Sequence, residues 1–223
     1  MKDKNYIKIS KDSSNFVLLT SYIPDIILEM RYFSSYNFVG KRINGYEEAC
    51  TITTKEAAIA LKKVNETLKK SGYILKIYDA YRPYKAVRHF VDWSKDLKDI
   101  SMKEYFYPNL DKSTLFKQNY IRKKSSHSRG STFDLTLFNL KTGKEVDMGG
   151  VFDYFGEVSH PSYKEITEEQ YKNRMLLRNV MIDYGFVPVE EEWWHFTLKN
   201  EPYSDTYFDF NVNSKNILNK EKD

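Results

Sequence analysis

Two short polar motifs, far apart in the sequence, constrain the fold of this chain more than any other feature. The first runs from Ser125 to Asp134 (SSHSRGSTFD), and the second is Glu192-Trp193-Trp194-His195. Together they offer two imidazoles and a carboxylate to a metal ion, with a further carboxylate three residues before the last histidine. A hydrolytic zinc site needs three such protein ligands and an open position for water. We therefore expect a fold that brings these two segments together.

The spacing within each motif places conditions on the backbone. His127 and Asp134 are seven residues apart, and an unbroken strand would put them on opposite faces. Gly130 lies between them and permits a bend that turns both side chains toward one point. Glu192 must lie at the start of a strand, or on a bulge, to act beside His195. Judged by spacing alone, both motifs are also compatible with purely structural roles.

Other residues that could carry chemistry are less well placed. His89 lies within a predicted helix and is expected to pack or to face solvent. His160 precedes Pro161 in a predicted turn, where a role in capping or loop support is expected. Cys50 is the only cysteine, which excludes an internal disulfide and a multi-cysteine zinc site and suits a reducing compartment. The His-Glu-x-x-His and Gly-x-Ser-x-Gly motifs are absent. Metal-assisted hydrolysis is the one chemistry with a full set of parts.

Local signals predict an α+β protein without a regular alternation of helix and strand. Thr53 and Glu56 have the spacing of a capping box, as do Thr167 and Gln170. Predicted helices run from Thr53 to Gly72, from Pro83 to about Trp93 and from Thr167 to Tyr184, and predicted strands cover Tyr73–Asp79, Phe133–Leu140 and Phe186–Leu198, the last interrupted by Pro188.

The chain of 223 residues is 41% hydrophobic, enough for one packed core, and we expect one domain. We predict an N-terminal extension over residues 1–22, the domain over 23–212 and a polar, frayed tail over 213–223. No apolar run reaches the length of a signal peptide core or a membrane span, so a cytoplasmic protein is expected.

The charge pattern argues against nucleic acid as a partner. The net charge is only +4, and the densest basic run, Arg122-Lys123-Lys124, is interpreted as a solvated loop. The oligomeric state is not specified by any pattern, and a homo-oligomer stays open.

Several motifs closely resemble those of the zinc D-alanyl-D-alanine dipeptidases, the VanX-like branch of the D-Ala metallopeptidases. The resemblance covers about Ile23 to Val212 in the family's order. It rests on SxHSRGxxxDLTL and EWWH together with NFVG and GY (37–46), DAYRP (79–83), DMGG with FD (147–153) and DTYFDF (205–210).

The resemblance implies a single domain of the hedgehog-like type, with a central antiparallel sheet flanked by helices. It implies one zinc ion per chain, with Glu192 as the general base and Arg82 stabilising the oxyanion. Spacing alone instead favours a salt bridge from Arg82 to Asp79 or Asp92. The zinc ligands implied are His127, Asp134 and His195.

The implied reaction is hydrolysis of the free dipeptide D-alanyl-D-alanine to two D-alanines. Asp153 aligns with a carboxylate that grips the substrate ammonium, and Tyr32 and Ser125 align with positions that line the pocket. Glycopeptide resistance, wall recycling and scavenging would all use this reaction. The alternatives are a D,D- or L,D-carboxypeptidase acting on longer wall peptides and a zinc-binding module without catalysis.

Two positions depart from the family pattern. Ser131-Thr132-Phe133 replaces a smaller sequence that is often found there, and Gly150 stands where threonine is common. Both departures bear on the shape of the pocket rather than on the metal ligands.

Overall fold

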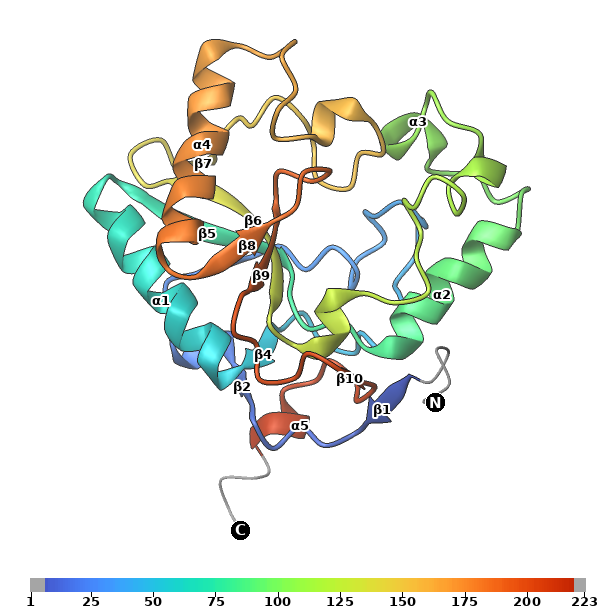
Figure 1. Cartoon of the computed structure of the whole chain (residues 1–223), viewed down its shortest axis with the longest axis horizontal. Coiled ribbons are helices and arrows are strands. Elements are labelled where there is room, and N and C mark those ends of the chain that lie inside the picture. The colour runs from blue at the N-terminus through green and yellow to red at the C-terminus, as the bar shows by residue number, and fades with distance from the viewer. Residues whose placement is uncertain (1–6, 219–223) are drawn as a thin grey trace.

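A sheet of six strands organises the chain in the computed structural model, which describes residues 7–218 (Figure 1). The strand order is β3-β5-β6-β9-β8, with β7 paired to β6. All neighbours are antiparallel except β3 and β5, which run parallel. The strands are β3 (Ile27–Leu28), β5 (Tyr73–Asp79), β6 (Thr132–Asn139), β7 (Lys144–Glu145), β8 (Phe186–Pro188) and β9 (His195–Leu198).

Two small two-stranded sheets complete the β structure. β1 (Lys8–Ser10) runs parallel to β10 (Thr206–Phe208), and β2 (Phe16–Leu18) pairs antiparallel with β4 (Ile52–Thr54). Phe16 and Leu19 are buried, as is Ile217 near the other end. Residues from the predicted extension and tail thus join the core, while residues 1–6 and 219–223 of those segments lie outside the described residues.

Helices cover the sheet and confirm the α+β class. α1 packs against β5, α4 packs against β8, and the two helices contact each other. α2 and α3 lie on the other side of the molecule (Figure 1). The helices are α1 (Lys55–Lys70), α2 (Tyr84–Lys95), α3 (Lys103–Phe106), α4 (Glu168–Asp183) and α5 (Lys215–Leu218), with 3-10 turns η1 (Leu19–Ser21), η2 (Lys112–Thr114), η3 (Ser126–Arg129) and η4 (Glu157–Ser159). Within residues 7–218, no helix combines the length and apolarity that crossing a bilayer needs.

The predicted capping box at Thr53 is wrong, although the helix that it introduces is present. The N-cap residue is Thr54, and its side chain makes no capping hydrogen bond. Thr53 Oγ1 instead donates to the carbonyl of Gly130 at 2.8 Å, and Thr54 Oγ1 bonds Ser131 Oγ at 2.7 Å. Both threonines therefore tie the start of α1 to the corner before β6. That tertiary use outweighs the local capping pattern.

The other helix signals agree with the structure. Thr167 and Gln170 form the predicted capping box, with bonds of 3.2 and 2.8 Å. α2 begins directly after Pro83.

The predicted strand from Phe186 to Leu198 is wrong over residues 189–194. β8 ends at Pro188, whose missing N–H cannot continue a ladder, and β9 begins only at His195. A turn fills the interval, with the His195 N–H donating to the Glu192 carbonyl at 3.3 Å. Trp193 and Trp194 both lie in this turn and are both buried.

Gly130 is expected to be indispensable for both fold and site. Its φ of +87° lies in the left-handed region, and an added Cβ would come within 2.2 Å of the Phe16 ring. Gly130→Ala should lower the free energy of unfolding by about 2 to 5 kcal/mol, measured by urea titration. Gly143 is the matched control, because its φ is +65° and nothing lies within 4 Å of an added Cβ. Gly143→Ala should cost about 1 kcal/mol, and equal losses would contradict the role of packing against Phe16.

Candidate active site

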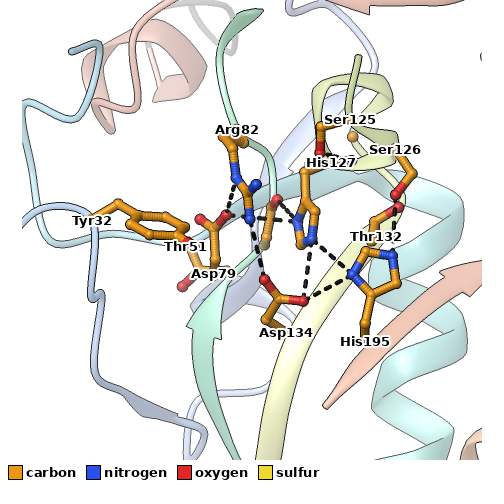
Figure 2. A network of polar contacts seen from close by, with 12 residues as sticks. Tyr32, Thr51, Asp79, Arg82, Ser125, Ser126, His127, Thr132, Asp134 and His195 are labelled. Carbon is orange, nitrogen blue, oxygen red and sulfur yellow. Dashed lines mark hydrogen bonds and ion pairs between the residues drawn. The ribbon is translucent and has the colours of Figure 1, made fainter. Parts of the chain in front are cut away.

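Three adjacent strands place acidic and imidazole side chains in one row across the sheet. Asp79 at the end of β5 is the cross-strand partner of Asp134 on β6, and Asp134 in turn pairs with His195 on β9. His127 comes from η3, which the left-handed Gly130 joins to β6. Figure 2 shows His127, Asp134 and His195 pointing toward one another. The bend predicted at Gly130 is therefore confirmed.

The three predicted ligand atoms form a nearly equilateral triangle. Asp134 Oδ1 lies 3.2 Å from His127 Nε2 and 3.0 Å from His195 Nδ1, and the two nitrogens are 3.2 Å apart. Ligands bound about 2.0–2.1 Å from a tetrahedral zinc ion lie about 3.3 Å from one another. These residues form a group able to hold a metal ion in the part of the chain that the structure describes.

Each of these side chains is held from its other end. His127 Nδ1 bonds the Ala80 carbonyl at 2.7 Å, and His195 Nε2 bonds Ser126 Oγ at 3.2 Å. Asp134 Oδ2 accepts from Arg82 Nη2 at 3.2 Å. Such outer hydrogen bonds select the tautomer and orientation of metal ligands. The donor set and its support therefore fit a divalent cation such as zinc.

The pKa shifts of the candidate ligands indicate their protonation states. Burial lowers the pKa of His127 to about 4, against the pull of the Asp134 carboxylate. Burial would raise the pKa of Asp134, but His127 and His195 outweigh it and hold that pKa below its usual range. At neutral pH His127 is thus neutral and Asp134 is ionised, as ligands must be. Burial would lower the pKa of His195, but the hydrogen bond and charge of Asp134 raise it, so any proton on His195 must be released when a metal ion binds.

Arg82 is held beside the ligands by two carboxylates. Its Nε donates to Asp79 Oδ2 at 2.8 Å, in addition to the bond from Nη2 to Asp134. The salt bridge to Asp79 predicted from spacing is therefore present, whereas Asp92 pairs with Lys95. The guanidinium also lines the cavity in front of the ligands, so the ion pair does not remove it from the site.

Glu192 lies directly beyond the ligand triangle. Its Oε2 is 3.5 Å from His195 Nδ1, and its side chain is 43% exposed. Glu192 reaches this position from the turn that precedes β9, rather than from the start of a strand or a bulge. Local burial, together with the charge of Asp134, raises its pKa against the opposing effect of His195. A carboxylate with a raised pKa suits a general base working near neutral pH.

Asp153 and Tyr32 form a second polar group in the same cavity. The Tyr32 hydroxyl donates to the Asp153 carboxylate, with oxygen separations of 2.9 and 3.1 Å. Asp153 is 7% exposed and has a φ of +63°, and its pKa is raised mainly by burial. No lysine or arginine forms an ion pair with this carboxylate among residues 7–218.

All eight predicted site residues line one cavity of about 570 Å³. Ser125 is among them, and its Oγ accepts from the His127 N–H at 3.3 Å. The structure thus brings together the metal-ligand candidates, the base candidate, Arg82 and the pocket candidates.

Comparison with known proteins places these features in a family. The sequence profile described as D-Ala-D-Ala dipeptidase (Peptidase_M15) matches residues 12–213. The chain belongs to the D-Ala-D-Ala dipeptidase family. A D-alanyl-D-alanine dipeptidase from Enterococcus faecalis is 41% identical over 89% of this chain and 98% of its own. Proteins of the same name from Streptomyces coelicolor and Escherichia coli are 36% and 34% identical, over 90% and 84% of this chain and 99% and 86% of theirs.

Sequence reasoning missed Ser126, which orients His195 in this dipeptidase-family site. Ser126 adjoins the predicted Ser125, but its contact comes from a distant strand. Asp79 was predicted as a salt-bridge partner of Arg82, but not as part of the site. It anchors Arg82 there while accepting from Tyr46 at 2.6 Å.

The remaining histidines and the cysteine lie outside the cavity lining. His89 Nδ1 accepts the Asn44 N–H at 3.1 Å, a packing role as predicted. The His160 carbonyl accepts from Arg174 at 2.8 Å. Burial raises the pKa of the Cys50 thiol to about 12, which leaves it protonated and a poor nucleophile.

Proposed function

We propose that this chain hydrolyses D-alanyl-D-alanine to two D-alanines, using one zinc ion held by His127, Asp134 and His195. One observation carries the proposal most directly. The three candidate ligand atoms lie within 3.2 Å of one another at the wall of a cavity. The Glu192 carboxylate lies 3.5 Å from one of them, His195 Nδ1. The names of the relatives supply the substrate, and the residues present match the chemistry that it needs.

The residues around the ligands divide the reaction between them. When bound, zinc would polarise the peptide carbonyl and increase the acidity of water. Glu192 takes the proton from the attacking water and returns it to the leaving amine. Arg82 faces the cavity with a fixed positive charge, which stabilises the negative charge that develops on the carbonyl oxygen. Asp79 holds that guanidinium in place.

The Asp153–Tyr32 pair is suited to the substrate's ammonium. A buried carboxylate without a basic side-chain partner is costly, and a bound ammonium would supply the missing charge. Ser125 lines the same cavity and completes a small polar pocket. Recognition of a free ammonium favours a dipeptide over the N-acylated end of a longer wall peptide.

Asp153→Asn is expected to raise KM for the free dipeptide by about a hundredfold while leaving kcat within a fewfold. The substitution keeps the size and an acceptor for Tyr32 but removes the charge that pairs with ammonium. Steady-state release of D-alanine measures the effect. Asp92→Asn is the control, because Asp92 is exposed and pairs only with Lys95. A KM unchanged in the Asp153 variant would refute the ammonium role.

The decisive experiment combines metal analysis with D-alanine release. We expect one zinc per chain, loss of activity with a chelator and recovery when zinc is returned. The free dipeptide should be cleaved and its N-acetylated analogue should not. Equal turnover of both would identify a carboxypeptidase, and zinc without turnover of either would identify a binding module.

We place this activity in the cytoplasm, where free precursor dipeptide is available and a single thiol stays reduced. The enzyme would then act on a small molecule and need neither nucleic acid nor a membrane as a partner.

A further inference from the structure

Arg174 is a buried charge for which the proposed reaction has no use. It lies on α4, is 1% exposed and shares the inward face of that helix with Leu177 and Met181. Burial lowers its pKa to about 10, so it stays protonated at neutral pH. A buried guanidinium normally pairs with a carboxylate. No carboxylate lies within ion-pair distance of Arg174 in the part of the chain that is described.

Its partners are three backbone carbonyls. Nε donates to Met148 O at 2.6 Å, Nη2 to Val158 O at 2.8 Å and Nη1 to His160 O at 2.8 Å. The single planar guanidinium thus binds the backbone at both ends of one loop. That loop runs from the end of β7 to η4, and Asp153 lies midway in sequence between Met148 and Val158.

Within this loop, Asp153 adopts a backbone conformation that it would not hold by itself. Its φ of +63° is unfavourable for a residue other than glycine and persists only where the surroundings enforce it. The carboxylate must also stay buried against Tyr32. At its middle the loop reaches across to α3, where the Phe155 N–H donates to Phe106 O at 2.7 Å (Figure 1).

Gly150 leaves room for the close approach of Arg174. A Cβ added there would lie 3.3 Å from Arg174 Nη2 and 3.3 Å from both Val158 Cγ2 and the Val158 carbonyl. The departure from threonine at this position is therefore tied to how the guanidinium reaches the loop.

We infer that Arg174 is a positioning residue that closes the 148–160 loop and so presents the Asp153 carboxylate to the substrate ammonium. The expected effect on KM rests on the proposed dipeptidase function, whereas the expected effect on the structure of the loop does not. Arg174 is not among the residues that line the cavity or among the candidate metal ligands.

Arg174→Lys tests the inference, because it keeps the charge but cannot span three carbonyls. KM for D-alanyl-D-alanine should rise about tenfold, with kcat and zinc content changed less than about twofold. Arg174→Gln should have a larger effect in the same direction. Arg88→Gln makes the same chemical change on an exposed position of α2 and should leave KM unaltered.

A double-mutant cycle with Asp153→Asn separates positioning from general stabilisation. If Arg174 acts through Asp153, Arg174→Lys should change KM less than twofold once the carboxylate is gone. Independent, multiplying effects of the two substitutions would overturn the inference.

Hydrogen exchange gives a readout that does not depend on activity. In Arg174→Lys, amides of residues 149–157 should exchange at least about tenfold faster, while those of β6 and the core of α4 stay protected. Unchanged exchange in the loop would overturn the inference even in an inactive protein. Lack of dipeptidase activity in the wild-type protein would instead count against the proposed function alone.

Discussion

Glu192→Gln should bind zinc as the wild-type protein does and hydrolyse D-alanyl-D-alanine about 10³-fold more slowly. The side chain keeps its size and its place 3.5 Å from His195 Nδ1 but can no longer accept a proton. Positioned general bases contribute about 10² to 10⁴-fold to rate. The loss should appear in kcat, because the proposed ammonium site is formed by Asp153 and Tyr32 and does not include Glu192. Stopped-assay measurement of D-alanine, paired with metal analysis of the same sample, gives both quantities.

Glu190→Gln provides the control for that substitution, since Glu190 is exposed in the same turn and pairs with Arg178. Its activity should stay within about twofold of wild type. Zinc lost in parallel with turnover in the Glu192 variant would mean that Glu192 is itself a ligand. The assignment of a base would then be wrong.

His127→Ala should abolish zinc binding at micromolar metal and, with it, all measurable turnover. Removing one of the three proposed ligands would leave only Asp134 and His195, too few protein ligands to hold a tetrahedral ion tightly. His127 is buried, and the bond between its Nδ1 and Ala80 O fixes the orientation of the ring. Equilibrium dialysis against zinc measures the change directly.

His89→Ala is the matched comparison, because His89 lies on α2 and accepts only the Asn44 N–H. It should keep one zinc ion and nearly full activity. Full zinc occupancy in His127→Ala would show that the ion is held elsewhere, and the proposed triad would have to be abandoned.

The chemistry of the site was readable from the sequence because residue type carries it. Few histidines are present, and the two in polar motifs are the two that meet at Asp134. The register of the sheet could not be predicted from the sequence. The alignment of Asp79, Asp134 and His195 arises from pairings between strands distant in the chain, and no local pattern encodes such pairings.

Local signals failed where tertiary contacts competed with them. Thr53 has good capping spacing, yet its hydroxyl serves the Gly130 carbonyl instead. Arg174 lies on the inward face of α4 and is buried. The periodicity of polar and apolar residues would instead place a charged residue on the face of the helix that points to solvent. A side chain that binds backbone carbonyls leaves no complementary residue in the sequence to indicate its partner.

The cross-strand alignment of Asp134 with both neighbours has a consequence for how the protein matures. A shift of one residue in the pairing of β6 would turn the Asp134 carboxylate to the opposite face of the sheet, away from the two histidines. With the proposed metal site, only the native alignment would gain the free energy of metal binding, so the ion would favour correct strand pairing over the shifted register. Refolding in the presence of zinc should accordingly return a larger fraction of correctly paired molecules than refolding in a chelator.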